Sequence, residues 1–155
     1  MKEYIKWFVI VLLSFMAAWY VSTYKYQFML IQGESMEPSY HNMQPVILEK
    51  DFSEITAGDV VACKCEALDA ILVKRVVAVP GDTVSIAEGV LYVNGKPSAH
   101  QRPDARIAYA GIAEEPILLG PEEYFLLGDN YEYSKDSRYE EINVMKENAI
   151  IGKIL

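Results

Sequence analysis

Residues that hold metal ions or disulfide bonds are scarce in this chain. Its 155 residues include only two cysteines, Cys63 and Cys65, and two histidines, His41 and His100. Two cysteines that stand two positions apart on a strand point to the same face with poor disulfide geometry, and two thiolates cannot complete a tetrahedral zinc site. We therefore predict no disulfide framework and no metal centre, with half-buried apolar cysteines and surface histidines.

Clusters of basic residues are also absent. The 14 Lys and Arg residues are outnumbered by 22 Asp and Glu residues, which gives a net charge of −8. Nucleic-acid binding needs clustered positive charge that releases counterions from phosphates, so this composition excludes a nucleic-acid partner. A hydrophobic share of 52% with 23% charged residues excludes a disordered tail and a membrane protein with many spans. One compact domain with one membrane anchor fits best.

Charge is missing altogether from one long segment near the N-terminus. The 18 residues from Trp7 to Tyr24 contain no Asp, Glu, Lys or Arg. As a helix they would be about 27 Å long, close to the ~30 Å of a bilayer core. Aromatic residues of the kind that favour membrane interfaces lie at both ends: Trp7, Trp19, Tyr20, Tyr24 and Tyr26. This segment predicts a transmembrane helix.

A cleaved signal peptide and a buried core helix are the alternatives for the same segment. A signal peptide needs small residues at positions −3 and −1 of its cleavage site, whereas a cut after Ala17 or Ala18 would place Phe15 or Met16 at −3. We therefore expect the segment to stay attached as an anchor.

The charges beside the span predict its orientation. Lys2, Lys6 and the N-terminal amine precede it and only Lys25 follows it closely, so the positive-inside bias places the N-terminus in the cytoplasm. Residues 1–25 would then be a cytoplasmic tip and a single-pass anchor in the cell membrane. Residues 26–155, with 21 acidic against 11 basic side chains, would form an extracytoplasmic domain.

After the anchor the pattern changes to short runs of alternating apolar and polar residues, which is typical of β-strands. Glu88-Gly89 and Asn94-Gly95 stand where tight hairpin turns need residues that tolerate positive φ. We predict a mainly β domain with coil from Ser98 to Gly120. The predicted strands are Pro45–Glu49, Asp59–Cys63, Ala70–Val79, Thr83–Ala87, Val90–Val93, Tyr124–Leu127 and Ala149–Ile154.

The first of three segments with chemical interest is Gly33-Glu34-Ser35-Met36-Glu37-Pro38. Ser35 lies ten residues after Lys25, so any chemistry there would take place near the bilayer surface. A serine between a glycine and a proline more often belongs to an ordinary turn, so this segment alone does not establish a nucleophile.

The second segment, from Ile71 to Asp82, carries two adjacent cations on a strand. Lys74 and Arg75 point to opposite faces, and each has aliphatic neighbours on its own face. An edge strand whose basic side chains reach water would show the same pattern. When both faces are equally apolar, the two basic side chains cannot both reach water easily. One then needs a carboxylate partner, and burial can keep the other neutral. A neutral lysine is a general base.

The third segment, from Gly128 to Arg138, follows the apolar run Tyr124–Leu127 and is rich in polar and charged residues. It is either a polar turn with local pairing of Asp and Arg, or a source of groups that hold a buried lysine and balance Arg75.

In this order and behind an anchor, the three segments resemble the type I signal peptidases, the membrane-anchored Ser-Lys proteases that remove leader peptides from exported proteins. The resemblance covers nearly the whole chain and has a Gram-positive character. The matching boxes are Gly33-x-Ser35-Met36-x-Pro38 for the nucleophile, Lys74-Arg75-Val76-Val77-x-x-Pro80-Gly81-Asp82 for the general base, and Gly128-Asp129-Asn130-x-x-x-Ser134-x-Asp136-Ser137-Arg138 at the C-terminal end.

The resemblance implies a role for each matching residue. Ser35 would be the nucleophile, Lys74 the general base, and Ser134 the hydroxyl that orients the lysine. The supporting residues would form two ion pairs, Asp136 with Arg138 and Asp129 with Arg75. The implied fold is the β catalytic domain shared by signal peptidases and LexA-like proteins.

The implied substrate is an exported preprotein with small residues at −1 and −3 of its cleavage site. Shallow apolar pockets would select them, because a larger side chain overpacks such a pocket. We place Ile31, Met36 and Val73 on the substrate-binding walls, since they lie in or beside the catalytic boxes. No cofactor is implied. The implied partners are signal peptides of preproteins, the lipid bilayer and, as a candidate, the secretion translocon.

Gly33 departs from part of the family. Some members, chiefly Gram-negative ones, have a serine there whose hydroxyl serves the oxyanion hole. In this chain the hole is expected to use the backbone N–H of Ser35 and solvent.

Two other classes remain open. A self-cleaving Ser-Lys regulator of the LexA type shares the dyad, and Ala110-Gly111 resembles the bond that such a regulator cuts, but no basic DNA-binding module precedes the domain. A non-catalytic membrane-tethered binding protein would retain the fold, although the intact Ser35 and Lys74 argue against it.

Overall fold

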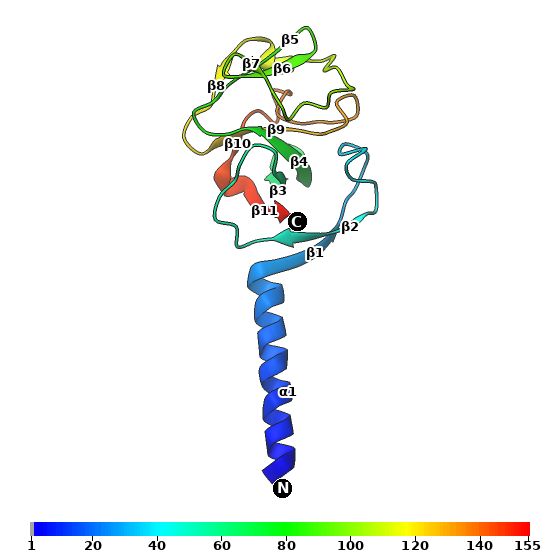
Figure 1. The fold of residues 1–155 in the computed structure, drawn as a ribbon, viewed down its shortest axis with the longest axis vertical. Helices are drawn as coiled ribbons and strands as arrows, with labels where there is room; N and C mark the ends of the chain where they lie inside the picture. The colour runs from blue at the N-terminus through cyan, green and yellow to red at the C-terminus, as the bar shows by residue number, and fades with distance from the viewer. Residues whose placement is uncertain (1) are drawn as a thin grey trace.

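An apolar helix extends away from the β-rich part of the chain (Figure 1). In the computed structural model, which describes residues 2–155, helix α1 comprises Lys2–Tyr20 and continues as the π-helical turn η1, Val21–Lys25. Residue 1 of the predicted segment 1–25 lies outside the described residues. The stretch Glu3–Lys25 is long and apolar enough to cross a membrane, and its most apolar window is 0% buried within the protein. The predicted apolar N-terminal helix is thus confirmed.

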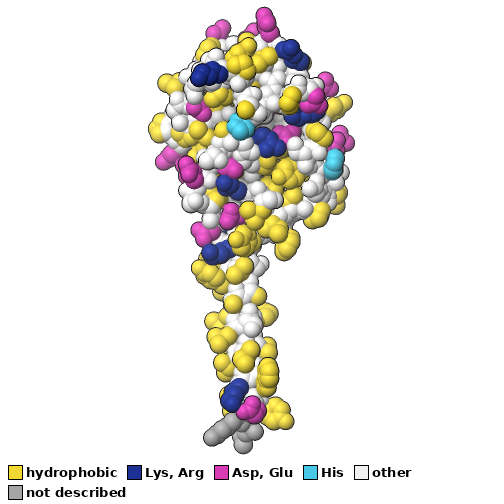
Figure 2. Space-filling view, viewed as in Figure 1, with side chains coloured by type: hydrophobic (Ala, Val, Ile, Leu, Met, Phe, Trp, Pro, Cys, Tyr) yellow, Lys and Arg dark blue, Asp and Glu magenta, His cyan; other side chains and the backbone are white. Residues whose placement is uncertain are grey.

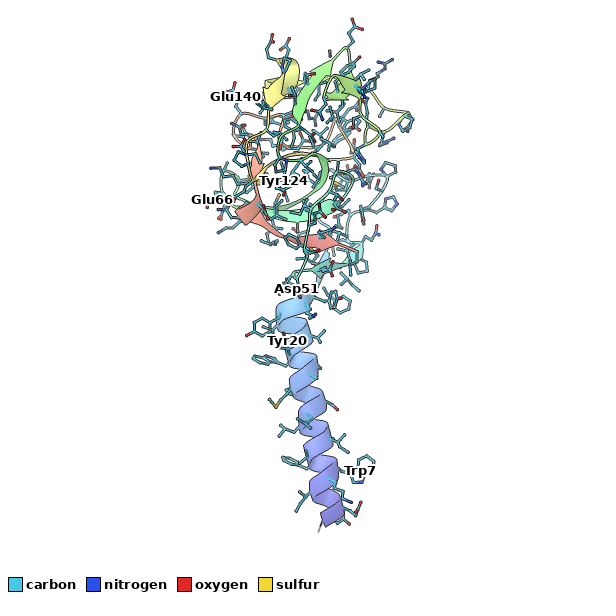
Figure 3. The ribbon with its side chains drawn as sticks, turned by 60° about the vertical axis from the view of Figure 1, so that its left-hand side comes forward. Trp7, Tyr20, Asp51, Glu66, Tyr124 and Glu140 are labelled. Carbon is cyan, nitrogen blue, oxygen red and sulfur yellow. The ribbon has the colours of Figure 1, made fainter. Side chains whose placement is uncertain are left out.

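From Glu3 onward, the side chains of α1 are exposed, and the described part of the chain does not cover them. Figure 2 shows hydrophobic side chains along most of the helix, while charged side chains gather on the β-rich part and at the N-terminal tip. Trp7 and Tyr20 lie near opposite ends of the helix and point away from its axis (Figure 3). An isolated helix that is apolar all round needs an apolar environment from outside the chain.

A seven-stranded antiparallel sheet contains most of the residues that lie in strands. Its order is β1-β2-β11-β3-β4-β9-β10, so strands from both ends of the sequence meet in its middle. The strands are β1 (Tyr26–Leu30), β2 (Pro45–Glu49), β3 (Val60–Cys65), β4 (Ala70–Ala78), β9 (Glu123–Leu127), β10 (Met145–Lys146) and β11 (Ile150–Ile154).

A smaller four-stranded sheet lies at the end of the molecule farthest from the helix (Figure 1). The two predicted hairpin turns are present in it, with positive φ at Glu88 (51°), Gly89 (78°), Asn94 (52°) and Gly95 (73°). Its order is β7-β6-β5-β8, with β5 (Thr83–Ala87), β6 (Val90–Val93), β7 (Lys96–Pro97) and β8 (Ile117–Leu118). Two short 3-10 helices, η2 (Gly111–Glu114) and η3 (Glu147–Ala149), complete the fold.

Strand β4 is shared by the three apolar clusters that form the core. Val73 belongs to a cluster beneath β1 and β2, Val76 to one on the opposite face of the large sheet, and Val77 to one that reaches the small sheet. Burying side chains of this size stabilises the fold by about 1.5–3 kcal/mol each. The central part of β4 is therefore dry on both faces, and this is the environment in which Lys74 lies.

The mainly β fold class is confirmed, and some details of the prediction need correction. Strand β1 was not predicted, because its residues continue the apolar and aromatic character of the anchor. The segment 98–120 is not all coil, since it contains η2 and β8. Cys63 and Cys65 are fully rather than half buried, with free thiols. His100 lies at the surface as predicted, half-buried, with its ring packed against Gly58.

Candidate active site

Ser35 lies in a turn that follows β1. The turn begins at Gly33, whose φ of +85° is in the left-handed region that favours glycine. It is closed by backbone hydrogen bonds from Glu37 N–H to Glu34 O (3.1 Å) and from Tyr40 N–H to Met36 O (2.9 Å). Met36 points into the core, which leaves Ser35 half-buried at the edge of the sheet.

Strand β4 brings Lys74 to this serine. Lys74 lies opposite Val61 of the buried strand β3, and its side chain is only 3% exposed. Its Nζ lies 2.7 Å from Ser35 Oγ and donates a hydrogen bond to the carbonyl oxygen of Val73 at 3.0 Å. The structure therefore brings together the predicted nucleophile and general base, which are 39 residues apart in the sequence.

Burial lowers the pKa of the Lys74 amine from its ordinary value of 10.5. The cause is desolvation, which disfavours the ammonium form in apolar surroundings. The nearby carboxylate of Asp136 acts in the opposite direction, but burial outweighs it. A lysine with a lowered pKa has a larger neutral fraction at a given pH, and the neutral amine is the form that accepts a proton.

Arg75, the next residue on β4, points to the other face and has a carboxylate partner. Its Nε and one terminal nitrogen donate to the two carboxylate oxygens of Asp129 at 2.8 and 2.6 Å. Its other terminal nitrogen donates to Gly58 O at 2.8 Å. This two-bond pairing raises the pKa of Arg75 and ties β4 to the loop that follows β9.

Asp136 and Arg138 form a second ion pair in which both side chains are 0% exposed. Arg138 donates to the two carboxylate oxygens at 2.7 and 2.9 Å and also to the carbonyl oxygens of Tyr131 and Ser134. Asp136 in turn accepts a hydrogen bond from Gly128 N–H at 3.0 Å. The pair thus holds the 128–138 loop in one shape beside Lys74.

Ser134 is buried near Ser35 and Lys74, but its side-chain hydroxyl has no hydrogen-bond partner among the described residues. Its side-chain oxygen is the one buried side-chain polar atom without a partner among the residues that the structure describes. A Cβ built on Gly128 would collide with that oxygen and would lie 2.5 Å from the backbone oxygen of Ser35. Ser134 therefore lies close to the nucleophile's backbone, while its predicted role in orienting Lys74 stays a prediction.

A groove of about 810 Å³ leads to Ser35 and Lys74. One wall is formed by β1 and the other by the first half of β4, and the three predicted substrate-binding residues, Ile31, Met36 and Val73, all line it. Within residues 2–155, strand β1 pairs only with β2, and β4 before Arg75 pairs only with β3. Both walls therefore present unpaired strand edges to whatever occupies the groove.

Two asparagines that were not predicted as site residues contact the Ser35 turn. Asn130 donates from its side chain to Glu34 O (3.1 Å) and from its backbone N–H to Ser35 O (3.0 Å). Asn42 accepts a hydrogen bond from Gly33 N–H at 3.0 Å. Asn130 is one of the matching residues of the C-terminal box, although the resemblance gave it no role, and the sequence held no signal for Asn42.

Comparison with known proteins identifies the family. The sequence profile of the family described as "Signal peptidase, peptidase S26" matches residues 1–155. The chain belongs to this family. Signal peptidase I P of Bacillus subtilis subsp. natto is 29% identical over 96% of this chain and 85% of its own length. Signal peptidase IB of Staphylococcus aureus strain Mu50 is 29% identical over 99% of this chain and 88% of its own.

A solved structure supports the fold. The crystal structure of a signal peptidase I from Enterococcus faecalis V583 superposes with a TM-score of 0.54 at 21% identity, covering 68% of this chain and 100% of that one. The predicted family and fold are thus confirmed, and the chain is an S26 serine peptidase. Membership favours this class over a self-cleaving regulator. Consistently, Ala110 and Gly111 line a cavity separate from the groove at Ser35.

Proposed function

We propose that this protein is a type I signal peptidase that removes signal peptides from secreted preproteins, with Ser35 as nucleophile and Lys74 as general base. One observation carries the residue assignment. The Nζ of a lysine that is 3% exposed lies 2.7 Å from the Oγ of a serine at the end of a groove. A serine hydroxyl is a weak nucleophile until a neighbouring base takes its proton, and a desolvated amine is such a base.

In the first step the neutral amine of Lys74 takes the Ser35 hydroxyl proton as Oγ attacks the carbonyl carbon of the last signal-peptide residue, at position −1. The backbone N–H of Ser35 stabilises the oxyanion of the tetrahedral intermediate. The ammonium of Lys74 then gives its proton to the departing amine. The mature protein leaves, and the signal peptide stays attached to Ser35 as an ester.

In the second step Lys74 takes a proton from water, and the resulting hydroxide attacks the ester carbonyl. Collapse of this second intermediate breaks the ester bond and passes the proton from Lys74 to Ser35 Oγ. The signal peptide leaves as a carboxylic acid, which loses its proton to water. The ammonium of Lys74 has three donors. Ser35 Oγ and Val73 O account for two, and we assign the third to Ser134, whose buried hydroxyl lacks a partner.

The groove explains a preference for small residues. The substrate extends as a strand between the open edges of β1 and β4, so that alternate side chains point down into the groove. There they meet Ile31, Met36 and Val73, which are 2%, 1% and 9% exposed and belong to one packed cluster. A larger side chain at −1 or −3 overpacks these walls.

The apolar helix is the membrane anchor in this proposal. It spans the cell membrane once with its N-terminus in the cytoplasm, which places residues 26–155 on the extracytoplasmic face, close to the lipid bilayer. Preproteins emerge there from the secretion translocon, so the enzyme and its substrate share one membrane surface.

The test is cleavage of a preprotein with Ala at −3 and −1 by the full chain in detergent. Wild type is expected to cut once, and Ser35→Ala and Lys74→Ala are expected to leave the preprotein intact. Lys64→Ala, a change at an exposed lysine of the neighbouring strand β3, is the matched control and should keep full activity. If Lys74→Ala still cleaves the preprotein, Lys74 is not the base. If the wild-type protein cuts only itself and leaves the preprotein intact, the self-cleaving regulator is favoured.

A further inference from the structure

We propose that Asn42 and Asn130 are positioning residues that together aim the backbone N–H of Ser35 at the substrate's carbonyl oxygen. This inference rests on the proposed function, because it concerns the oxyanion hole of the same site. Gly33 has no side chain, so the nucleophile turn supplies no hydroxyl of its own to that hole. The rate then depends on how well the single backbone donor is oriented, and two asparagines from different loops hold the turn that carries it.

Asn130 fixes the peptide group to which the Ser35 N–H belongs. Its side-chain amide donates to Glu34 O at 3.1 Å, and its backbone N–H donates to Ser35 O at 3.0 Å. A trans peptide is planar, with its C=O and N–H pointing in opposite directions. A bond that holds the Glu34 carbonyl therefore also sets the direction of the Ser35 N–H. No hydrogen bond within residues 2–155 uses that N–H as its donor, so it is free for the oxyanion.

Asn42 fixes the other end of the same turn. Its side-chain oxygen accepts a hydrogen bond from Gly33 N–H at 3.0 Å. Gly33, at φ +85°, is the most freely rotating point of the turn, because no Cβ limits its backbone. Asn42 is itself held in register, since Ile31 N–H donates to Gln44 O (2.9 Å) and Met43 N–H donates to Ile31 O (2.8 Å).

The two asparagines use opposite hydrogen-bonding functions, which provides an isosteric test. Asn42 accepts with its oxygen, whereas the Asn130 side chain donates with its nitrogen. Aspartate has the shape of asparagine and accepts but does not donate when ionised. The same substitution should therefore be tolerated at position 42 and harmful at position 130.

The experiment measures kcat and KM for a preprotein-derived peptide on the full chain in detergent. Asn130→Asp is expected to lower kcat by roughly 10- to 100-fold, somewhat less than the loss of a whole oxyanion donor, with KM little changed. Asn42→Ala is expected to lower kcat in the same way, and Asn42→Asp to restore it to within about twofold of wild type because the acceptor is kept.

Three controls separate this inference from other effects. Rates are taken on the alkaline plateau of the pH profile, because a new carboxylate near Lys74 shifts the pH at which the amine becomes neutral. Thermal unfolding shows whether a variant is merely less stable. Wild type and Ser35→Ala are run in parallel, so that an inactive wild type or an active Ser35→Ala marks failure of the proposed function itself.

When the wild type is active and Ser35→Ala is inactive, two outcomes would overturn the inference on the asparagines while leaving the proposed function intact. One is a wild-type kcat in Asn130→Asp. The other is an equal loss in Asn42→Asp and Asn42→Ala, because a residue that acts through its acceptor must be rescued when the acceptor is kept.

Discussion

The position of one buried amine determines the pH range in which this enzyme works. Burial lowers the pKa of Lys74 from 10.5, and in the proposed mechanism the neutral amine is the active base. We expect kcat/KM to rise with pH through an apparent pKa below 10.5 and then to level off, because the neutral fraction of Lys74 grows as pH passes its folded-state pKa. A pH–rate profile of peptide cleavage measures this. A rate that rises only around pH 10.5 would show a solvated, ordinary lysine.

The same burial means that Lys74 lowers the free energy of unfolding at neutral pH, because the unfolded chain binds a proton that the buried amine holds less tightly. Between its lowered folded pKa and 10.5 the unfolded chain binds more protons at this site, so the free energy of unfolding rises with pH there. Lys74→Met is therefore expected to be inactive yet more stable than wild type at neutral pH, with the difference shrinking as pH approaches 10.5. Chemical denaturation at several pH values measures this, with Lys64→Met as the exposed-lysine control. A Lys74→Met chain that is less stable at neutral pH would contradict the argument.

Arg138 has the opposite effect on stability. Its ion pair with Asp136 has both side chains 0% exposed, and removing one partner would leave a buried carboxylate without its counter-charge. Arg138→Met is expected to lower the free energy of unfolding by roughly 3–5 kcal/mol in a denaturant titration. Lys135→Met, which breaks the solvent-exposed pair with Glu141, is the matched control and should change it little. Similar losses in both variants would argue against a structural role for the buried pair.

Strand β9 ends where the catalytic segments meet, and Gly128 makes that meeting possible. An alanine Cβ at this position would collide with the side chain of Ser134 and would lie 2.5 Å from Ser35 O. The loop must then move away from the nucleophile turn, and small displacements of a catalytic group cost about 100-fold in rate. Gly128→Ala is expected to lose about that much in kcat, as measured by peptide cleavage. Gly95→Ala, at a turn where an added Cβ meets nothing within 4 Å, is the control and should retain its rate.

At the scale of strands, the sequence predicts the elements that have a clear apolar alternation. Pro45–Glu49, Thr83–Ala87 and Val90–Val93 have the same bounds in the structure as in the prediction. The two-residue strands β7, β8 and β10 are too short to show a period of two and form because a neighbouring strand supplies their hydrogen bonds. Strand β1 was missed because its pattern merges with that of the anchor, so one wall of the groove could not be predicted.

The features of the site also fall into two groups, those that the sequence predicts and those that it does not. Lys74 and Arg75 could be assigned to opposite faces because alternation on a strand follows from backbone geometry. Their side-chain partners are far away in the sequence: Ser35 is 39 residues from Lys74, and Asp129 is 54 residues from Arg75. Only the family resemblance named these partners. Asn42 and Asn130 escaped prediction because asparagine is an ordinary turn residue, and its side-chain contacts depend on how two loops pack.

At the scale of the whole molecule, the anchor and the groove are joined without a flexible connection. Lys25 ends the helical segment and Tyr26 begins β1, the strand that forms one wall of the groove. The turn after β2 holds this junction: Lys50 N–H donates to Lys25 O at 2.7 Å, and Lys50 Nζ donates to Thr23 O at 3.3 Å. Asp51, labelled at the junction in Figure 3, lies 3.5 Å from Lys25 Nζ. On the proposed membrane location, this junction fixes the height of Ser35 above the bilayer.

Loosening that junction should slow the cleavage of membrane-inserted preproteins without slowing the cleavage of soluble peptides. A Gly-Ser-Gly-Ser insertion between Lys25 and Tyr26 lets the domain move by about 11 Å relative to its anchor, comparable with the ~17 Å length of β1. A signal peptide held in the same bilayer presents its cleavage site at one height, so its effective concentration at Ser35 falls. We expect processing of a membrane-inserted preprotein in proteoliposomes to slow by roughly tenfold, while cleavage of a short soluble peptide stays at the wild-type rate. Equal rates on the preprotein would show that the anchor serves only as a tether, and an equal loss on both substrates would show that the insertion damages the groove itself.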